Sequence, residues 1–236
     1  MAKKRVLHRV ESFPEPQLKD TCDTVIANLK FASIDEPLKT ICVTSTMPDE
    51  GKTTIAMNIA AAAVADGGRA LLMEGDMRNN RIAAIMGLRS EHDLTDVLSG
   101  SARVADALQR TSVPGLYFLD ARTGIPNPPS LFDSARFAAL LERAKEKFDL
   151  IIVDTPPLSL FVDAAIVASK CDGTVFVVRE HHAKRRMVAK ALDQLERAEA
   201  NVVGSVLTFS KNKKDDYYYS YGSYYYSDEG RSRKRR

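Results

Sequence analysis

The alternation of short apolar runs with segments of helical spacing constrains the fold of this chain more than any other feature. The apolar runs predict strands, and the segments between them predict helices. The predicted strands are residues 39–44, 69–73, 116–119, 150–153, 174–178 and 202–207, and the predicted helices are residues 17–33, 53–66, 94–98, 131–147, 164–169 and 184–198. This order predicts an α/β fold with a mainly parallel sheet and helices on both faces. Such sheets bind ligands at the carboxyl ends of their strands.

Length and charge divide the chain into three parts. The 236 residues fit one α/β domain plus a tail, and we expect a lead-in with one helix at 1–38, the main domain at 39–210 and a tail at 211–236. The tail holds eight Lys/Arg and four Asp/Glu, whereas residues 1–210 hold 26 basic and 27 acidic residues. Because the body is nearly neutral, it offers no basic groove, and nucleic acid is not an expected partner.

The cysteines and the apolar content indicate the compartment. Cys22, Cys42 and Cys171 are far apart and have neither metal-site nor disulfide spacing, which is typical of a reducing cytosol. The adjacent His181 and His182 are expected to be solvated. Since no apolar stretch is long enough to span a membrane, we expect a cytoplasmic protein that reaches a membrane only through a partner or its basic tail.

Residues 46–54 form a loop between the first predicted strand and an alanine-rich helix. They match the pattern Gly, four residues, Gly-Lys-Ser/Thr, except that Thr46 replaces the first glycine. The glycine lets the backbone wrap a phosphate, the helix N-terminus adds partial positive charge, the lysine neutralises phosphate oxygens, and the threonine can ligate Mg2+. The expected nucleotide contacts are Pro48, Asp49, Glu50, Gly51, Lys52, Thr53 and Thr54. The alternative is a surface turn that happens to contain Gly-Lys-Thr.

Two other predicted strands run directly into acids. Glu74, Asp76 and Arg78 follow the second strand, and Asp154 ends the strand at 150–153. An acid at the end of a buried strand is costly unless it faces a cation. Asp154 therefore fits a carboxylate that holds Mg2+, the alternative being a cap on the following turn.

The tail concentrates the tyrosines of the chain. Seven of the eight lie in the last twenty residues, in a stretch without aliphatic residues and with charged flanks. These residues are Tyr217, Tyr218, Tyr219, Tyr221, Tyr224, Tyr225 and Tyr226. A segment that cannot bury itself is predicted to be disordered, and its phenols are then best explained as groups on which another site acts.

Taken together, the loop at 46–54, the acids with Met-Arg at 74–78 and the Val-Asp-Thr-Pro-Pro strand end at 153–157 resemble the bacterial protein-tyrosine kinases of capsule and exopolysaccharide synthesis. Residues 94–100, 126–128 and 162–164 and the tyrosine-rich tail add to the resemblance. It implies a P-loop NTPase-type fold, ATP and Mg2+ as cofactors, and transfer of the γ-phosphoryl group to tail tyrosines of a neighbouring copy.

The resemblance also implies roles and partners. Lys52, Glu74, Asp76 and Asp154 would be catalytic, with Thr53, Asp76 and Asp154 at the metal and Arg78 at the nucleotide. The implied partners are a separate transmembrane polysaccharide co-polymerase that activates the kinase, other copies of the chain, and a tyrosine phosphatase. The implied location is the inner face of the cell membrane, reached through that co-polymerase.

Several positions depart from the pattern of this family or of its relatives. Met47 stands where the related partition and placement ATPases carry a lysine, which favours the kinase branch. Glu74 stands where the kinases usually have Asp, Thr208 replaces an Asn that touches the base, and the interface helix lacks arginines at Asp23 and Ile26. The alternatives are therefore a P-loop ATPase that positions cargo without phosphorylating it, and a nucleotide-binding regulator without catalysis.

Overall fold

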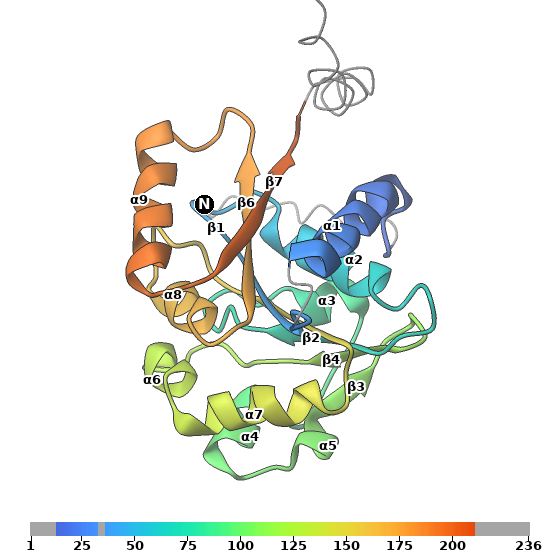
Figure 1. Cartoon of the computed structure of the whole chain (residues 1–236). Coiled ribbons are helices and arrows are strands. Elements are labelled where there is room, and N and C mark those ends of the chain that lie inside the picture. The colour runs from blue at the N-terminus through green and yellow to red at the C-terminus, as the bar shows by residue number, and fades with distance from the viewer. Residues whose placement is uncertain (1–12, 33–35, 211–236) are drawn as a thin grey trace, which may run out of the picture.

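The computed structural model describes residues 13–32 and 36–210, which form a seven-stranded sheet flanked by helices (Figure 1). The expected disorder and tyrosine chemistry of the 211–236 tail lie outside these residues. The strand order is β3-β4-β2-β5-β1-β6-β7, and every pair is parallel except β3 with β4. The strands are β1 Thr40–Ser45, β2 Ala70–Glu74, β3 Leu108–Arg110, β4 Leu116–Leu119, β5 Leu150–Asp154, β6 Gly173–Arg179 and β7 Val202–Thr208.

Helices cover both faces of the sheet, which confirms the predicted α/β architecture. Their bounds are α1 Lys19–Ala32, α2 Lys52–Ala62, α3 Ile82–Met86, α4 Leu94–Ser99, α5 Val104–Ala107, α6 Pro128–Phe132, α7 Ala135–Lys145, α8 Asp163–Ala168 and α9 Arg185–Arg197. Buried side chains of α1, α2 and α3 share one core cluster, and those of α4 to α9 share the other. The two clusters lie on opposite faces of the sheet because successive side chains of a strand alternate between its faces.

The central strands explain why the sequence shows continuous apolar runs rather than alternation. Every residue of β1, β2 and β5 is buried. Within β1, Ile41 and Val43 pack in the cluster with α1 and α2, whereas Cys42 packs in the cluster with α7 and α8. A strand covered on both faces must be apolar at nearly every position.

The structure departs from the sequence-based prediction in three places. Residues 131–147 form two helices, because Ser134 begins a new one and its hydroxyl accepts the N–H of Phe137. The lead-in contains a 3-10 turn at Pro16–Leu18 before α1. The sequence did not predict β3, a three-residue antiparallel edge strand whose residues are at most partly buried.

No helix within residues 13–32 or 36–210 combines the length and apolar character that crossing a membrane requires. The parallel order of β1, β5 and β2 brings their carboxyl ends to one edge of the sheet. The three expected groups of site residues follow these strand ends, so the topology gathers them as the sequence predicted.

Candidate active site

The loop after β1 has the backbone shape that a phosphate cradle needs. Asp49 and Gly51 both have left-handed φ angles, of 62° and 88°, and Gly51 is the N-cap of α2. Only glycine adopts this conformation at little cost. Turns with left-handed residues before a helix direct successive N–H groups into one concavity, which binds anions.

The buried residue Glu50 bonds this loop to β6 and β7, the strands that follow β1 in the sheet order. Its carboxylate accepts the N–H groups of Met47 at 2.6 Å and Arg179 at 3.3 Å. Its carbonyl accepts the hydroxyl of Thr208 at 2.7 Å. The sequence placed Glu50 in the loop but gave no signal that its side chain would bond to β6 and its carbonyl to β7.

The side chains of Arg179, the last residue of β6, and of His182 hold the outer part of the loop. Arg179 Nη1 donates to the carbonyl of Asp49 at 3.0 Å, and His182 Nε2 lies 2.9 Å from the carbonyl of Pro48. His181 and His182 are both exposed, as expected of a solvated pair, and His182 in addition contacts the loop. The positions of Pro48 and Asp49 are fixed through their backbone.

Lys52, Thr53, Asp76 and Asp154 come together as the sequence predicted. Lys52 Nζ lies 3.5 Å from Asp76 Oδ2 and 3.7 Å from Asp154 Oδ1. The hydroxyl of Thr53 donates to Asp154 Oδ2 at 2.6 Å. Thr54 follows in the first turn of α2. One cation thus faces two carboxylates at the mouth of the loop.

Asp154 carries a charge that its surroundings only partly neutralise. Its Oδ1 is buried and has no hydrogen-bond partner among the described residues. It also lies opposite Glu74 in the β2–β5 register. Burial raises the pKa of Asp154 although Lys52 and Thr53 oppose the shift. An additional cation at this point would relieve an unfavourable arrangement.

Glu74 is held by the backbone rather than aimed at Lys52. Its Oε1 accepts the N–H of Asp76 at 3.0 Å, and its Oε2 accepts those of Arg81 at 3.2 Å and Ile82 at 3.4 Å. Burial, reinforced by Asp154, raises the pKa of Glu74 well above its usual value. Glu74 therefore shapes the turn that leads into α3, whereas Asp76 presents Oδ2 to Lys52.

The glycine between these two acids fits where no other residue would. The N–H of Gly75 donates to the carbonyl of Asp154 at 2.7 Å. A Cβ atom at position 75 would approach that carbonyl oxygen to 2.6 Å. The ends of β2 and β5 are consequently held in close backbone contact.

Arg78 lies beside the acids, but its guanidinium contacts other residues. Nε and Nη2 each lie 3.3 Å from the carboxylate of Asp163, and Cζ lies 4.1 Å from the ring centroid of Phe161. The sequence predicted that Arg78 contacts the nucleotide. It gave no role to Phe161, and it included Asp163 only in the segment 162–164 that resembles the family. The contact of Arg78 with nucleotide stays a prediction.

The donor set suits Mg2+ bound together with a nucleotide. Among the described residues, no group of three His, Cys, Asp or Glu gathers as a self-sufficient metal site. In nucleotide sites Mg2+ takes only one or two protein ligands, with phosphates and waters completing the shell. The Thr53 hydroxyl and the unbonded Asp154 oxygen supply such ligands.

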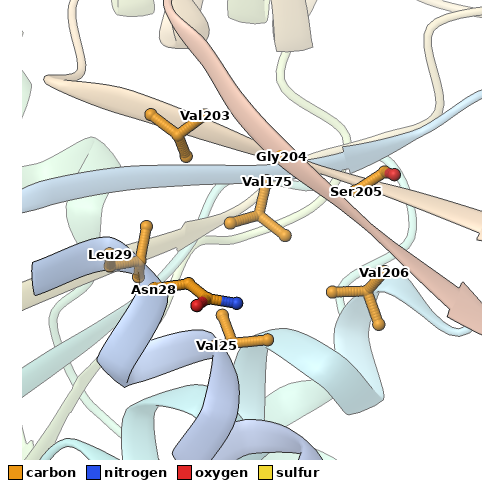
Figure 2. A pocket seen from close by; sticks show the side chains of 8 residues that line it. All are labelled: Val25, Asn28, Leu29, Val175, Val203, Gly204, Ser205 and Val206. Carbon is orange, nitrogen blue, oxygen red and sulfur yellow. The ribbon is translucent and has the colours of Figure 1, made fainter. Parts of the chain in front are cut away.

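A hollow of about 90 Å³ lies elsewhere, between α1 and the β6–β7 edge (Figure 2). Val25 and Leu29 line it from α1, and Val175 and Val206 line it from the strands. It is small, mainly apolar, and contains none of the expected site residues.

Comparison with known proteins identifies the family. Residues 38–183 match the AAA domain family. The chain is 37% identical over 192 residues to the tyrosine-protein kinase CpsD of Streptococcus pneumoniae, which covers 80% of this chain and 85% of the relative. The chain belongs to the bacterial tyrosine-protein kinase family.

Solved structures agree with this assignment. The kinase domain of the Escherichia coli tyrosine kinase ETK superposes with a TM-score of 0.77 at 25% identity, covering 89% of this chain and 88% of that one. The septum site-determining protein MinD from Pyrococcus horikoshii, complexed with Mg-ADP, superposes with a TM-score of 0.64 at 21% identity over 74% of this chain and 72% of its own. The latter likeness shows a shared fold, and the predicted P-loop NTPase-type fold is thereby confirmed for this kinase family member.

Proposed function

We propose that this chain is an ATP-dependent protein-tyrosine kinase that phosphorylates the tyrosines of residues 217–226. The observation that carries the proposal is the convergence of Lys52, Thr53, Asp76 and Asp154 on a preformed phosphate loop. Membership of the tyrosine-protein kinase family supports it, and so does the unusual concentration of phenols in the tail.

We propose ATP as phosphoryl donor and Mg2+ as the metal. Bound Mg2+ would neutralise part of the triphosphate charge and align its outer phosphates. Thr53, Asp76 and Asp154 would hold it. This role explains why an aspartate with an unbonded oxygen is kept buried at this point.

The residues of the chain divide the work of transfer. The loop N–H groups and Lys52 stabilise negative charge on the transferred group. The phenol oxygen of a tyrosine forms a bond to the γ-phosphorus while the bond from that phosphorus to the ADP oxygen breaks, and ADP leaves with the electron pair. Asp76 accepts the phenol proton through Oδ2, because this oxygen accepts no backbone N–H among the described residues, whereas both carboxylate oxygens of Glu74 do.

We further propose a place for this activity in the cell. A separate transmembrane polysaccharide co-polymerase would activate the kinase at the inner face of the membrane, and a tyrosine phosphatase would reverse the modification. Each phosphate adds about −1.5 to −2 charges, so a few modified tyrosines reverse the positive charge of the tail. The process served would be capsule or exopolysaccharide synthesis.

Intact-mass analysis of the full chain after incubation with ATP and Mg2+ tests the reaction. We expect several additions of about 80 Da each, and their loss in Lys52→Met. Lys145→Met is the matched control, because Lys145 pairs with Asp172 at the opposite end of the sheet, and it should retain the additions.

The rival functions give different results in the same experiment. Release of free phosphate with an unmodified tail would assign the chain to the cargo-positioning ATPases. Nucleotide binding without any turnover, in the presence of the co-polymerase partner, would make it a regulator and would refute the kinase proposal.

A further inference from the structure

The guanidinium of Arg78 is held in place and is still partly exposed. Nε and Nη2 bond to the buried Asp163, and the ring of Phe161 stacks on the group. A third of the side chain, 33%, nevertheless remains exposed. Its own backbone N–H donates to Asp76 Oδ1 at 3.2 Å, which places the residue directly beside the proposed proton acceptor.

The segment after β5 contacts Arg78 through the ring of Phe161 and exposes the apolar residue on each side of that ring. Leu160 is 56% exposed and Val162 is 48% exposed, although both flank the partly buried Phe161. The segment is held against the phosphate loop, because the N–H of Ser159 donates to the carbonyl of Thr46 at 3.0 Å. Exposed apolar side chains beside a buried acid cluster are a feature that stability alone does not explain.

We infer that Arg78 and residues 160–162 form the subsite for the acceptor tyrosine. The phenol ring would stack on the exposed part of the Arg78 guanidinium. Leu160 and Val162 would contact aliphatic atoms of the acceptor segment. Arginine sandwiched between aromatic rings is a favourable arrangement. The stacked ring would direct its hydroxyl toward Asp76. This inference rests on the proposed kinase activity and names its acceptor site.

Residues 217–226 of the tail are the occupant that fits this surface. The tail follows β7, whose last residue, Thr208, is bonded to the phosphate loop through Glu50, so it starts at the same edge of the sheet. The seven Cα–Cα steps from Ser210 to Tyr217 can span at most about 24 Å, which brings the first tyrosines within reach of this edge in the same or a neighbouring copy. The surplus of basic residues in the tail complements the carboxylates of the site.

The test measures acceptor binding separately from nucleotide binding. The enzyme is the full chain with all seven tail tyrosines changed to Ser, and the acceptor is the full-length Lys52→Met chain, which keeps its tyrosines. Initial rates are measured against acceptor concentration and against ATP concentration, with the double change Leu160→Ser and Val162→Ser, with Phe161→Leu, and with Arg78→Lys. We expect the KM for the acceptor to rise about tenfold in each variant, while the KM for ATP stays within about twofold of the parent value in the variants of residues 160–162.

Two control variants remove exposed apolar side chains elsewhere. Phe31→Ser on α1 and Leu192→Ser on α9 change residues that are 76% and 38% exposed, and neither should alter either KM. Thermal unfolding of each variant verifies that it is folded. Arg78→Lys keeps the positive charge but removes the planar group on which a ring can stack. A raised acceptor KM in this variant supports ring stacking, and an unchanged KM would refute it.

The outcomes separate the two proposals. If the parent enzyme phosphorylates the acceptor but the variants of residues 160–162 leave the acceptor KM unchanged, the subsite is refuted and the kinase proposal stands. Equal increases in both KM values would also refute it. If the parent enzyme, with the co-polymerase partner present, binds ATP yet never modifies the acceptor, both proposals fail.

Discussion

A lysine lies beside an aspartate at each end of the sheet, but the hydrogen bonding of the aspartate differs between the two ends. At the starts of the strands, Asp172 accepts the N–H groups of Lys39 and Thr40, both at 2.9 Å, and Lys145 Nζ at 2.8 Å. At the strand ends, Asp154 keeps one buried oxygen without a hydrogen bond among the described residues. The first arrangement is complete within the chain, whereas the second is not.

The pKa values of the two acids differ in the same sense. Burial would raise the pKa of Asp172, but Lys145 and the backbone N–H groups outweigh it and the pKa is lowered. Burial raises the pKa of Asp154 in spite of Lys52. One end of the sheet therefore contributes to folding stability, and the other retains unfavourable electrostatics that a bound ligand can relieve.

Asp154→Asn should give the largest effect, because it changes the aspartate whose hydrogen bonding is incomplete. We expect phosphorylation of the tail to fall by at least about 100-fold, because a metal ligand is lost. The free energy of unfolding should rise by about 1 kcal/mol, because one of several neighbouring carboxylates loses its charge. Intact-mass kinetics and urea unfolding measure the two effects. Retained activity, or a stability loss of about 2 kcal/mol, would contradict the assignment.

Asp172→Ala should have the reverse effect. The free energy of unfolding should fall by about 2 kcal/mol at pH 7, while phosphorylation stays unchanged. Since the folded-state pKa of Asp172 lies below its unfolded value of about 3.9, its stabilisation is complete above that pH and is lost as the pH falls through the folded pKa. The difference from the parent chain should therefore shrink below about pH 4, as urea unfolding at several pH values would measure.

Asp133→Ala is the control for that series. Asp133 pairs with Lys170 at 3.1 Å but is 73% exposed, so its removal should cost less than about 1 kcal/mol. A loss as large as that of Asp172→Ala would mean that the two acids do not differ in the way the structure indicates.

Ligand-induced stabilisation tests the same comparison through nucleotide and metal binding. ADP with Mg2+ at ten times the dissociation constant should stabilise the parent chain by about 1.4 kcal/mol, and chelation of the metal should remove most of this gain. Asp172→Ala should retain the shift and Asp154→Asn should lose it. Thermal unfolding with and without chelator measures both, and an equal shift in the two variants would count against metal binding by Asp154.

Local sequence patterns predicted most of the fold and the centre of the site. The buried strands β1, β2 and β5 have continuous apolar runs, and the acids at their ends follow directly in sequence. Parallel topology then brings those ends together, so Lys52, Asp76 and Asp154 could be placed in one site before the structure was known.

What the sequence could not predict depends on distant neighbours. Glu50 anchors the loop through Arg179, which lies 129 positions away, and Asp163 holds Arg78 across 85 positions. The break between α6 and α7 depends on a cap that competes with continued helix. Such roles leave no periodic or motif-like trace, because each requires a partner whose position only the folded chain determines.

The close backbone contact at Gly75 limits how this family of sites can vary. Since position 75 admits no side chain beside the Asp154 carbonyl, the separation of the two acidic strand ends cannot be adjusted by substitution there. The length of the side chain at position 74 can still vary, and it sets how far the carboxyl group extends from β2. The glutamate at this position is long enough for its carboxyl group to reach the amides of Arg81 and Ile82, so Glu74 braces the adjoining turn from the end of β2.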